Sequence, residues 1–282
     1  MAAESLSDNV THVSIHGSIK IISAEVFYEH PNIVELICHI GVRIIEQKAF
    51  YQCPRLKQVV MPGVEKVEKS AFGCCRDLEY VECGKLEIIK EYAFLACSFR
   101  GINLPSARIV EESALNECME LLDVNFGKNL ESVGKRAFCN SEFLERITIP
   151  LKNGLFEHDD TFCWCQSFHQ IHLVERDIPD ETVSALQLAE WRNDMIRVIN
   201  SINQVLPNTS HGDYHDDVGE KAFIIRQWIG CLLHKIIRYK ALHRQLLNEA
   251  ATTLQHTLPF DIVRNNILSF LELPLHKFDG ER

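Results

Sequence analysis

The apolar positions of the first 173 residues follow one pattern, which returns seven times. A small residue precedes an aromatic anchor, a cysteine follows three positions after the anchor, a leucine comes three positions later and an alternating strand comes next, as in Ala71, Phe72, Cys75, Leu78 and Val81. Successive anchors are 23, 22, 22, 21, 23 and 24 residues apart. The anchors are Phe27, Phe50, Phe72, Phe94, Leu115, Phe138 and Phe162. A fixed period in this range is typical of a solenoid, in which each unit buries its apolar side chains only against its neighbours.

Each unit is expected to contain one short strand whose alternate residues face the core. In the clearest copy, Val59 and Met61 share one side of the strand, whereas Gln58 and Val60 face the other. Strands of successive units are expected to pair in parallel, about 4.8 Å apart. The unit that holds Ile102 is one residue short, so its register moves by one. The other inward pairs are Leu36/Cys38, Val81/Cys83, Ile102/Leu104, Val124/Phe126, Ile147/Ile149 and Ile171/Leu173.

The second half of each unit has a Val or Ile five residues before the anchor, followed by polar residues and the small residue. We expect a short helical or 3₁₀ turn around each anchor. The cysteines three residues after the anchors are Cys53, Cys75, Cys97, Cys118 and Cys165. They could be a column of thiols that binds metal or forms disulfides. The interpretation that we favour is a ladder of small buried residues, because the spacing follows the repeat and not a ligand pattern.

These residues resemble the BspA-type leucine-rich repeats, over about residues 19 to 174. The resemblance implies a curved solenoid of about seven units of 22–23 residues, with a parallel β-sheet on its concave face, and recognition of other macromolecules rather than catalysis. Some units depart from the pattern. The first has Val26 and His30 for Ala and Cys, the fifth has Leu115 for Phe, the sixth has Ser141 for Cys and the last has Thr161 for Ala.

Length and charge narrow the class of protein. The 282 residues suit one solenoid and one smaller module, and the formal net charge of −10 argues against bulk binding of nucleic acid. The start of the chain has no secretory signal, and no stretch has the roughly 18 apolar residues needed to span a bilayer. Eleven cysteines, five of them in the ladder, favour reduced thiols and therefore the cytoplasm, with the nucleus as the alternative.

The repeat stops after Val174, and a helical module is expected to follow. Pro179 with its acidic neighbours indicates a helix start, and apolar residues then recur at alternating steps of three and four at Leu188, Trp191, Met195, Val198, Ile202 and Val205. A similar seam follows at Ile225, Trp228, Leu232, Ile236, Tyr239, His243, Leu246 and Ala250. We therefore predict an antiparallel helical hairpin. The expected domains are an N-terminal extension (1–18), the solenoid (19–174), the hairpin (175–258) and a short capping helix with a tail (259–282).

Two segments of this module suggest other functions. Residues 221–244 carry six basic residues and no acidic one, as a membrane-surface or calmodulin-binding helix would. We favour a helix whose apolar side pairs with the first helix, since the charges of the two are complementary. Residues 258–271 resemble the opening of an F-box, which would make the chain an adaptor for ubiquitin ligation. The alternative for this segment is a capping helix that begins at Asp261.

The sequence contains two clusters that could hold a metal ion, and we favour neither as a site. The first is Cys163, Cys165, His169 and His172, whose side chains a strand would separate. The second is the polar loop from His211 to Asp217, which a mobile linker explains equally well. We find no phosphate-binding glycine loop, no nucleophile elbow and no paired catalytic carboxylates. We therefore expect no enzyme, no cofactor and no metal.

The predicted function is a protein-interaction module or scaffold. The outward side chains of the strands would bind a protein or peptide, with Tyr80 and Arg146 as anchors. The acids on the earlier strands indicate a partner that is basic at one end. We expect a monomer. The predicted partner-binding residues are Glu35, Gln58, Val60, Tyr80, Glu82, Asn103, Asp123, Asn125, Arg146, Thr148, Gln170 and His172, with Ile37 beside them.

Overall fold

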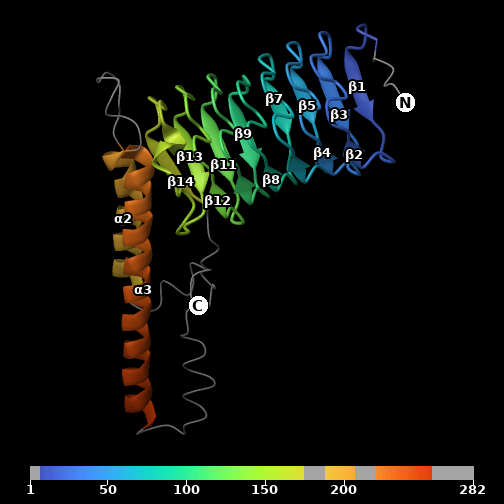
Figure 1. Cartoon of the computed structure of the whole chain (residues 1–282). Coiled ribbons are helices and arrows are strands. Elements are labelled where there is room, and N and C mark those ends of the chain that lie inside the picture. Colours follow the sequence, from blue (N-terminus) through green and yellow to red (C-terminus); the bar gives the residue numbers. More distant parts are fainter. Residues whose placement is uncertain (1–6, 175–187, 207–219, 256–282) are drawn as a thin grey trace. The chain divides into compact units, whose positions relative to one another are not determined.

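A computed structural model describes residues 7–174, 188–206 and 220–255 of the chain. Residues 7–174 wind into a solenoid with one coil for each of the seven anchors (Figure 1), which confirms the predicted fold. The contacts within the chain define two compact units. The first unit contains the solenoid and Asn203–Arg226, and the second contains Glu175–Ile202 and the residues from Gln227 onward. The break after Val174 coincides with an expected boundary, and the expected domains otherwise stay a prediction.

The long strands form two parallel sheets of four strands, ordered β1-β3-β5-β7 and β9-β11-β13-β14. The sheets are separated at the unit that is one residue short. β1 pairs with β3, so the first sheet begins before residue 19, within the segment expected to be an N-terminal extension. The strands are β1 (His12–Ile15), β3 (Glu35–Cys38), β5 (Gln58–Val60), β7 (Tyr80–Glu82), β9 (Gly101–Leu104), β11 (Asp123–Phe126), β13 (Arg146–Ile149) and β14 (Gln170–Leu173).

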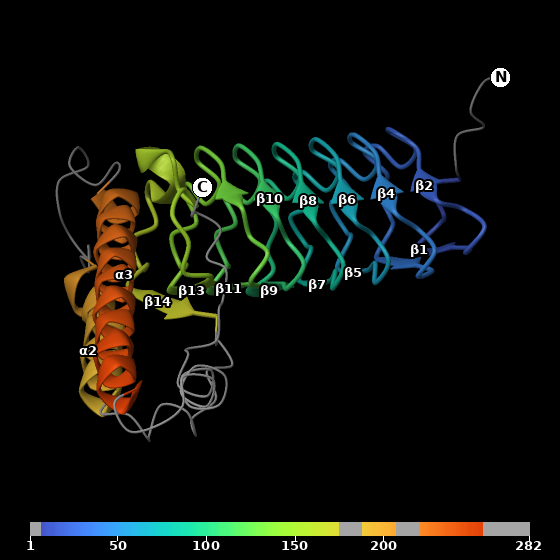
Figure 2. The same ribbon diagram turned by 90° about the horizontal axis from the view of Figure 1, so that it is seen from below.

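A third parallel sheet, which was not predicted from the sequence, runs along the opposite side of the coils (Figure 2). Each of its six strands has only two residues, and the second residue of each is the buried Val or Ile five positions before an anchor. A two-residue strand is too short to show an alternating pattern in the sequence. The strands are β2 (Ile21–Ile22), β4 (Ile44–Ile45), β6 (Lys66–Val67), β8 (Ile88–Ile89), β10 (Ile109–Val110) and β12 (Ser132–Val133).

The prediction of a helical or 3₁₀ turn around each anchor is wrong for all coils but the last, which contains the 3₁₀ helix η1 (Asp159–Phe162). The other anchors lie in non-helical turns. In the third coil, Ser70 and Cys74, two residues before and two after the anchor, have φ angles of 54° and 60°. The N–H groups of Ser70, Phe72 and Cys74 donate to carbonyl groups of the next coil at 2.7–2.9 Å. The anchor turns therefore form a third ladder between coils, built on left-handed residues that alternate with the anchors.

The anchors stack in register along the solenoid axis. The ring centroids of Phe50 and Phe72 are 5.3 Å apart and those of Phe72 and Phe94 are 5.5 Å apart, with nearly parallel planes. Leu115 continues the column and is fully buried. The coil that has this smaller anchor also has Phe126, the only aromatic residue among the inward strand positions. Phe126 packs edge-on against Phe138, which compensates for the volume that Leu115 lacks.

The cysteine column is a hydrogen-bonded ladder of buried thiols, which confirms and refines the interpretation we favoured. The Sγ–H of Cys75 donates to the carbonyl of Phe50 at 3.0 Å, and Cys118 donates to the carbonyl of Phe94 at 3.2 Å. In each case the acceptor is the anchor of the preceding coil. Ser141, which departs from the pattern, donates in the same way to the carbonyl of Leu115 at 3.1 Å. Burial raises the pKa of Cys118 to about 12, so it stays a protonated donor at neutral pH.

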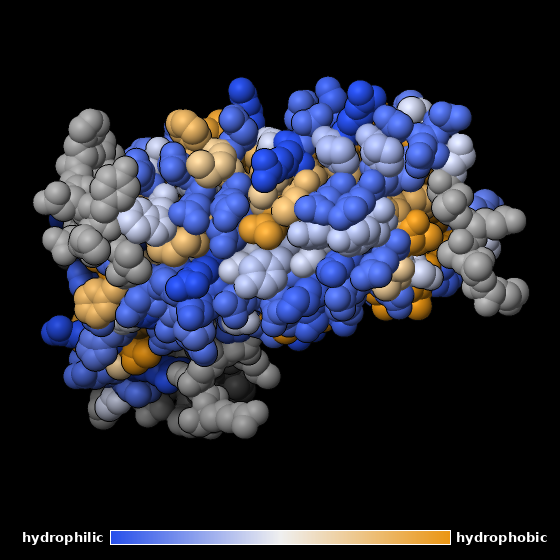
Figure 3. All heavy atoms as spheres, turned by 45° about the horizontal axis from the view of Figure 1, so that its top comes forward, coloured by the Kyte–Doolittle hydropathy of each residue, from blue (hydrophilic) through white to orange (hydrophobic). Residues whose placement is uncertain are grey.

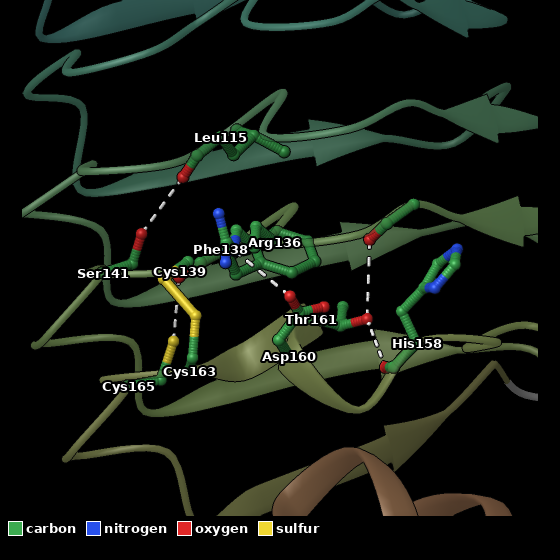
Figure 4. Close-up of a disulfide and its surroundings, with 11 residues drawn as sticks. Leu115, Arg136, Phe138, Cys139, Ser141, His158, Asp160, Thr161, Cys163 and Cys165 are labelled. Carbon is green, nitrogen blue, oxygen red and sulfur yellow. Dashed lines mark hydrogen bonds and ion pairs between the residues drawn. A yellow bond between two sulfur atoms is a disulfide. The ribbon is translucent and has the colours of Figure 1, made fainter. Parts of the chain in front are cut away.

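The expectation that the cysteines are reduced is wrong for two of them. Cys139 and Cys163 form a disulfide between the sixth and seventh coils (Figure 4), in which the other nine cysteines take no part. Both bonded cysteines directly follow an anchor, so the repeat places them at equivalent positions of adjacent coils. Their Cα atoms are 4.6 Å apart, within the range that a disulfide spans. The disulfide lies next to the thiol ladder at Cys165 but does not belong to it.

The helices are α2 (Leu188–Val205) and α3 (Glu220–Gln255). In the second unit, the indole Nε1–H of Trp228 donates to the carbonyl of Val198 at 2.9 Å, and the hydroxyl of Tyr239 donates to Asp194 at 2.9 Å. Among the predicted seam positions, Ile202, Ile225, Leu232 and Ile236 are buried. The prediction that the seam continues to Leu246 and Ala250 is wrong, because both side chains are exposed. Pro179 and the side chains of Leu188, Trp191, Met195, Val205 and His243 lie outside the described residues.

The hydrogen bond from the thiol ladder can be tested at Cys118. We expect Cys118→Ala to lower the free energy of unfolding by about 1–3 kcal/mol relative to Cys118→Ser, because only Ser keeps a donor for the Phe94 carbonyl. Urea unfolding followed by circular dichroism measures the difference. Ser141→Cys is the matched control and should be nearly neutral. If the alanine variant is as stable as the serine variant, the bond contributes nothing.

The disulfide gives a second prediction. Replacing both Cys139 and Cys163 by Ser should lower the free energy of unfolding by about 3 kcal/mol, because the bond closes a loop with a sequence separation of 24. Calorimetry of the wild type with and without a reducing agent should show the same loss. Equal stability of the oxidised and reduced wild type would contradict the prediction.

Candidate functional site: the strand face

The outward side chains of the long strands form two rows, which we call the strand face. All twelve predicted partner-binding residues lie on it, and none of them is buried. Whether they bind a partner stays a prediction. Figure 3 shows apolar patches set in a mainly hydrophilic surface. The first row is His12, Glu35, Gln58, Tyr80, Gly101, Asp123, Arg146 and Gln170, and the second is Ser14, Ile37, Val60, Glu82, Asn103, Asn125, Thr148 and His172.

The first half of the strand face combines apolar and acidic side chains. Ile37 is 41% exposed and lies beside the half-buried Val60, which in turn lies beside Glu82. Tyr80 is 52% exposed. Glu35 and Glu82 form no ion pair with any residue that the structure describes. This half therefore offers apolar contact area and acidic groups that have no basic partner within the described chain.

The second half is a network of polar side chains that bind one another. The side-chain amide of Asn125 donates to Asp123 at 3.0 Å, and the hydroxyl of Thr148 donates to the side-chain oxygen of Asn125 at 2.8 Å. Arg146 approaches Asp123 at 3.6 Å. Arg146, predicted from the sequence to be an anchor for a partner, forms an internal ion pair, and its role as an anchor stays a prediction. Asp123 is likewise engaged and is a poorer target for charge reversal than Glu82.

The sequence analysis missed Gly101, the only residue of the first row that has no side chain. It lies on β9 between Tyr80 and Asp123, at the point where the ladder between β7 and β9 is interrupted. The thiol of Cys83 donates to the carbonyl of Asn103 at 3.6 Å, so the two strands are still neighbours there. A glycine at a row position in the shortened unit was the available signal. We name the surroundings of this residue, Tyr80, Glu82, Gly101, Asn103 and Asp123, the Gly101 gap.

Neither metal hypothesis is supported where the structure describes the residues. Cys163 is oxidised in the disulfide, Cys165 donates to the carbonyl of Phe138 at 2.9 Å, and His169 contacts the carbonyl of Ser167. No group of three or more metal-ligating side chains is found among the described residues. The loop from His211 to Asp217 lies in the part that is not described.

The basic segment 221–244 is partly used within the chain. The ammonium group of Lys221, only 3% exposed, donates to the carbonyl of Cys165 at 2.5 Å and lies over the ring of Phe168. Arg226 forms an ion pair with Asp159 of the last coil. In the second unit, Lys235 is 3.7 Å from Asp194. These contacts favour the structural interpretation of the helix over a free basic surface.

The F-box-like segment 258–271 and the expected capping helix lie outside the described residues. None of the helices that the structure describes is long and apolar enough to cross a membrane.

Comparison with known proteins agrees with this geometry. The model of the BspA type leucine rich repeat region matches residues 5–97 and 87–190, with six copies. The chain belongs to this family. A leucine-rich repeat protein from Bacteroides ovatus has 19% sequence identity and a TM-score of 0.52, over 60% of this chain and 49% of that one. The T. pallidum leucine rich repeat protein has 20% identity and a TM-score of 0.39, over 69% of this chain and 80% of that one.

The match to the Bacteroides ovatus protein shows the fold, and the BspA-type chain spans only about half the length of that structure. A search of curated proteins finds no match. Leucine-rich repeat proteins are generally non-enzymatic modules for protein interaction or surface binding.

The contacts of Lys221 give a testable property of this leucine-rich repeat solenoid. Lys221→Met should increase amide hydrogen exchange in residues 166–173 by a factor of about 10 or more, because hydrogen bonds from a charged donor to the last coil are lost. Exchange around Leu36 should not change. Lys235→Met is the matched control, since Lys235 is 43% exposed and makes only a distant ion pair. An equal effect of both substitutions would contradict a capping role for Lys221.

Proposed function

We propose that this chain is a non-catalytic protein–protein interaction module that binds a protein or peptide partner on the strand face. The observation that carries the proposal is the contrast in charge pairing between the two sides of the solenoid. Glu35 and Glu82 on the strand face have no ion-pair partner among the described residues. Unpaired acids beside exposed apolar side chains are what a partner can use for contact area and for specificity.

The charges at the ends of the short strands are instead paired from coil to coil. Arg43 is 3.1 Å from Glu65, and Arg108 is 2.8 Å from Glu131. Such pairs stabilise an exposed surface only weakly, but they leave little charge free for a partner. The side of the short strands is therefore a poorer candidate for recognition than the strand face.

The size of the strand face fits an extended segment of a partner. Eight long strands are separated by seven steps of about 4.8 Å, which gives a face about 34 Å long. An extended peptide of about ten residues spans this length. Apart from the facing edges of β7 and β9, the backbone groups of the inner strands are paired in the ladders. The partner is therefore recognised mainly by side chains and not by addition of a strand to the sheet.

Charge reversal tests the proposal with a matched control. Glu35→Lys together with Glu82→Lys should weaken binding of partners at least tenfold, because the two introduced lysines would repel a basic segment that the acids attract. Glu29→Lys together with Glu120→Lys changes the net charge equally at exposed positions outside the two rows and should leave binding unchanged. The measurement is quantitative affinity purification from the native cell with each variant as bait, followed by titration of each recovered partner.

The outcome is decided by the difference between the two double variants. Partners lost with the strand-face variant and kept with the control support the proposed face. Partners kept equally by both variants, with unchanged affinity, contradict it.

A further inference from the structure

We propose that the Gly101 gap binds an arginine side chain of the partner. The inference rests on the proposed function, because it assigns the chemistry of one contact on the strand face. It begins with the position of Gly101 in the first row, between Tyr80 and Asp123 on the neighbouring strands. Gly101 pairs in register with Asp123 and contributes no side chain to the row, at the edge of β9 that faces β7 and has no strand partner.

The groups around the gap differ in chemistry and suit one kind of ligand. Tyr80 supplies an aromatic ring that is 52% exposed, Glu82 supplies a carboxylate without a described ion-pair partner, and Asn103 supplies an exposed amide. The carboxylate of Asp123 leans toward the gap, since a Cβ atom at Gly101 would meet it at 3.3–3.4 Å. The gap therefore combines two carboxylates with one aromatic face.

A guanidinium group is the cation that uses all of these groups at once. Its flat face stacks on an aromatic ring, and its N–H groups donate to carboxylates in a fixed fork. A lysine ammonium group is a compact, strongly hydrated charge that gains less from the ring. The positions just before the two strands, Glu79 and Arg100, carry opposite charges and largely offset each other.

Arg146 does not already fill this role. It approaches Asp123 from β13, on the side of Asp123 away from Gly101, and it lies three strands from Tyr80. Asn125 and Arg146 each contact one oxygen of Asp123, and a carboxylate accepts more bonds than these two contacts use. The internal network thus orients Asp123 and leaves it able to accept from an incoming guanidinium group.

The neighbours of the gap further define the partner. Glu82 lies beside Val60, and Val60 lies beside the exposed Ile37. A partner segment with an arginine next to an aliphatic residue would therefore place the arginine in the gap and the aliphatic side chain on Val60 and Ile37.

The test uses the full chain and blocked amino acids as probes. N-acetyl-arginine methylamide is titrated into the ¹⁵N-labelled protein, with the blocked lysine and the blocked citrulline as comparisons. We expect saturable shifts of the amides of Tyr80, Gly101 and Asn103 with arginine, with a dissociation constant on the order of 1–10 mM. The neutral citrulline should give none, and lysine should bind at least several-fold more weakly.

Variants connect the shifts to the gap. Gly101→Val fills the gap at an exposed strand position where only the end of a flexible carboxylate must move, and it should abolish the shifts. Tyr80→Phe should keep them, whereas Tyr80→Leu and Glu82→Gln should each weaken binding at least threefold. Gly84→Ala is the control, because a Cβ atom there meets nothing within 4 Å. Unchanged thermal unfolding of Gly101→Val shows that the protein is folded.

The results separate this inference from the proposed function. No saturable shift with arginine, or equal shifts with lysine that persist in Gly101→Val, would overturn the arginine site. The strand face would still stand if partners are lost by the charge-reversal variant and kept by Gly101→Val. Arginine binding at the gap with partners unaffected by every strand-face variant would instead overturn the proposed function and leave the site.

Discussion

Each coil of this solenoid satisfies its backbone polar groups only through the coils on either side, and the remaining features of the structure depend on this constraint. Three ladders join one coil to the next: the long strands, the two-residue strands and the anchor turns. A buried carbonyl that these ladders do not satisfy needs another donor. The thiols supply it for the anchors, as Cys75 does for Phe50. A coil is therefore stable only as a member of the stack, as is general for repeat proteins.

The anchor turns show why so many residues other than glycine adopt left-handed angles here. Ser113 and Glu117 have φ angles of 54° and 59°, conformations that cost an L-residue roughly 1–2 kcal/mol. Their N–H groups each donate to the next coil at 2.9 Å. A right-handed helical turn would direct these N–H groups back into the same coil and leave the carbonyls of the neighbour without donors. The ladder between coils outweighs the local preference.

The sequence predicts the parts of the fold whose signal repeats at a fixed register. The anchors, the inward strand pairs and the buried cysteine column could all be located, because each recurs at the same position of several units. A departure such as Ser141 is recognised by comparison with the other copies. The two-residue strands and the left-handed turns could not be predicted, since only contacts between coils define them. The disulfide had a signal, because Cys139 and Cys163 occupy equivalent positions of adjacent units. That signal was hidden by the more frequent cysteines two residues further along the chain.

The candidate site could likewise be predicted only in part from the sequence. The alternation along each strand predicts which side chains face solvent, so the outward position of Glu82 follows from the pattern that buries Val81 and Cys83. It does not predict which outward residues bind one another, and the ion pair of Arg146 with Asp123 was not predicted because it joins two coils. The repeat period predicts which residues of adjacent coils are neighbours. Which of several polar neighbours form a hydrogen bond or an ion pair depends on side-chain geometry.

The shortened fourth unit shows how the packing of the core affects the surface. One residue is missing between Cys97 and Ile102, and Phe99 fills the core position that a leucine has in other units. The core stays closed, since Phe99 is fully buried and packs edge-on against Phe94. The shortening is absorbed instead in the long-strand ladder, which is interrupted between β7 and β9. The strand face changes character at this interruption, from apolar and unpaired acidic side chains to an internally bonded polar network. Because the core must repeat while the outward rows need not, this irregular unit is where the two halves of the strand face come to differ in chemistry.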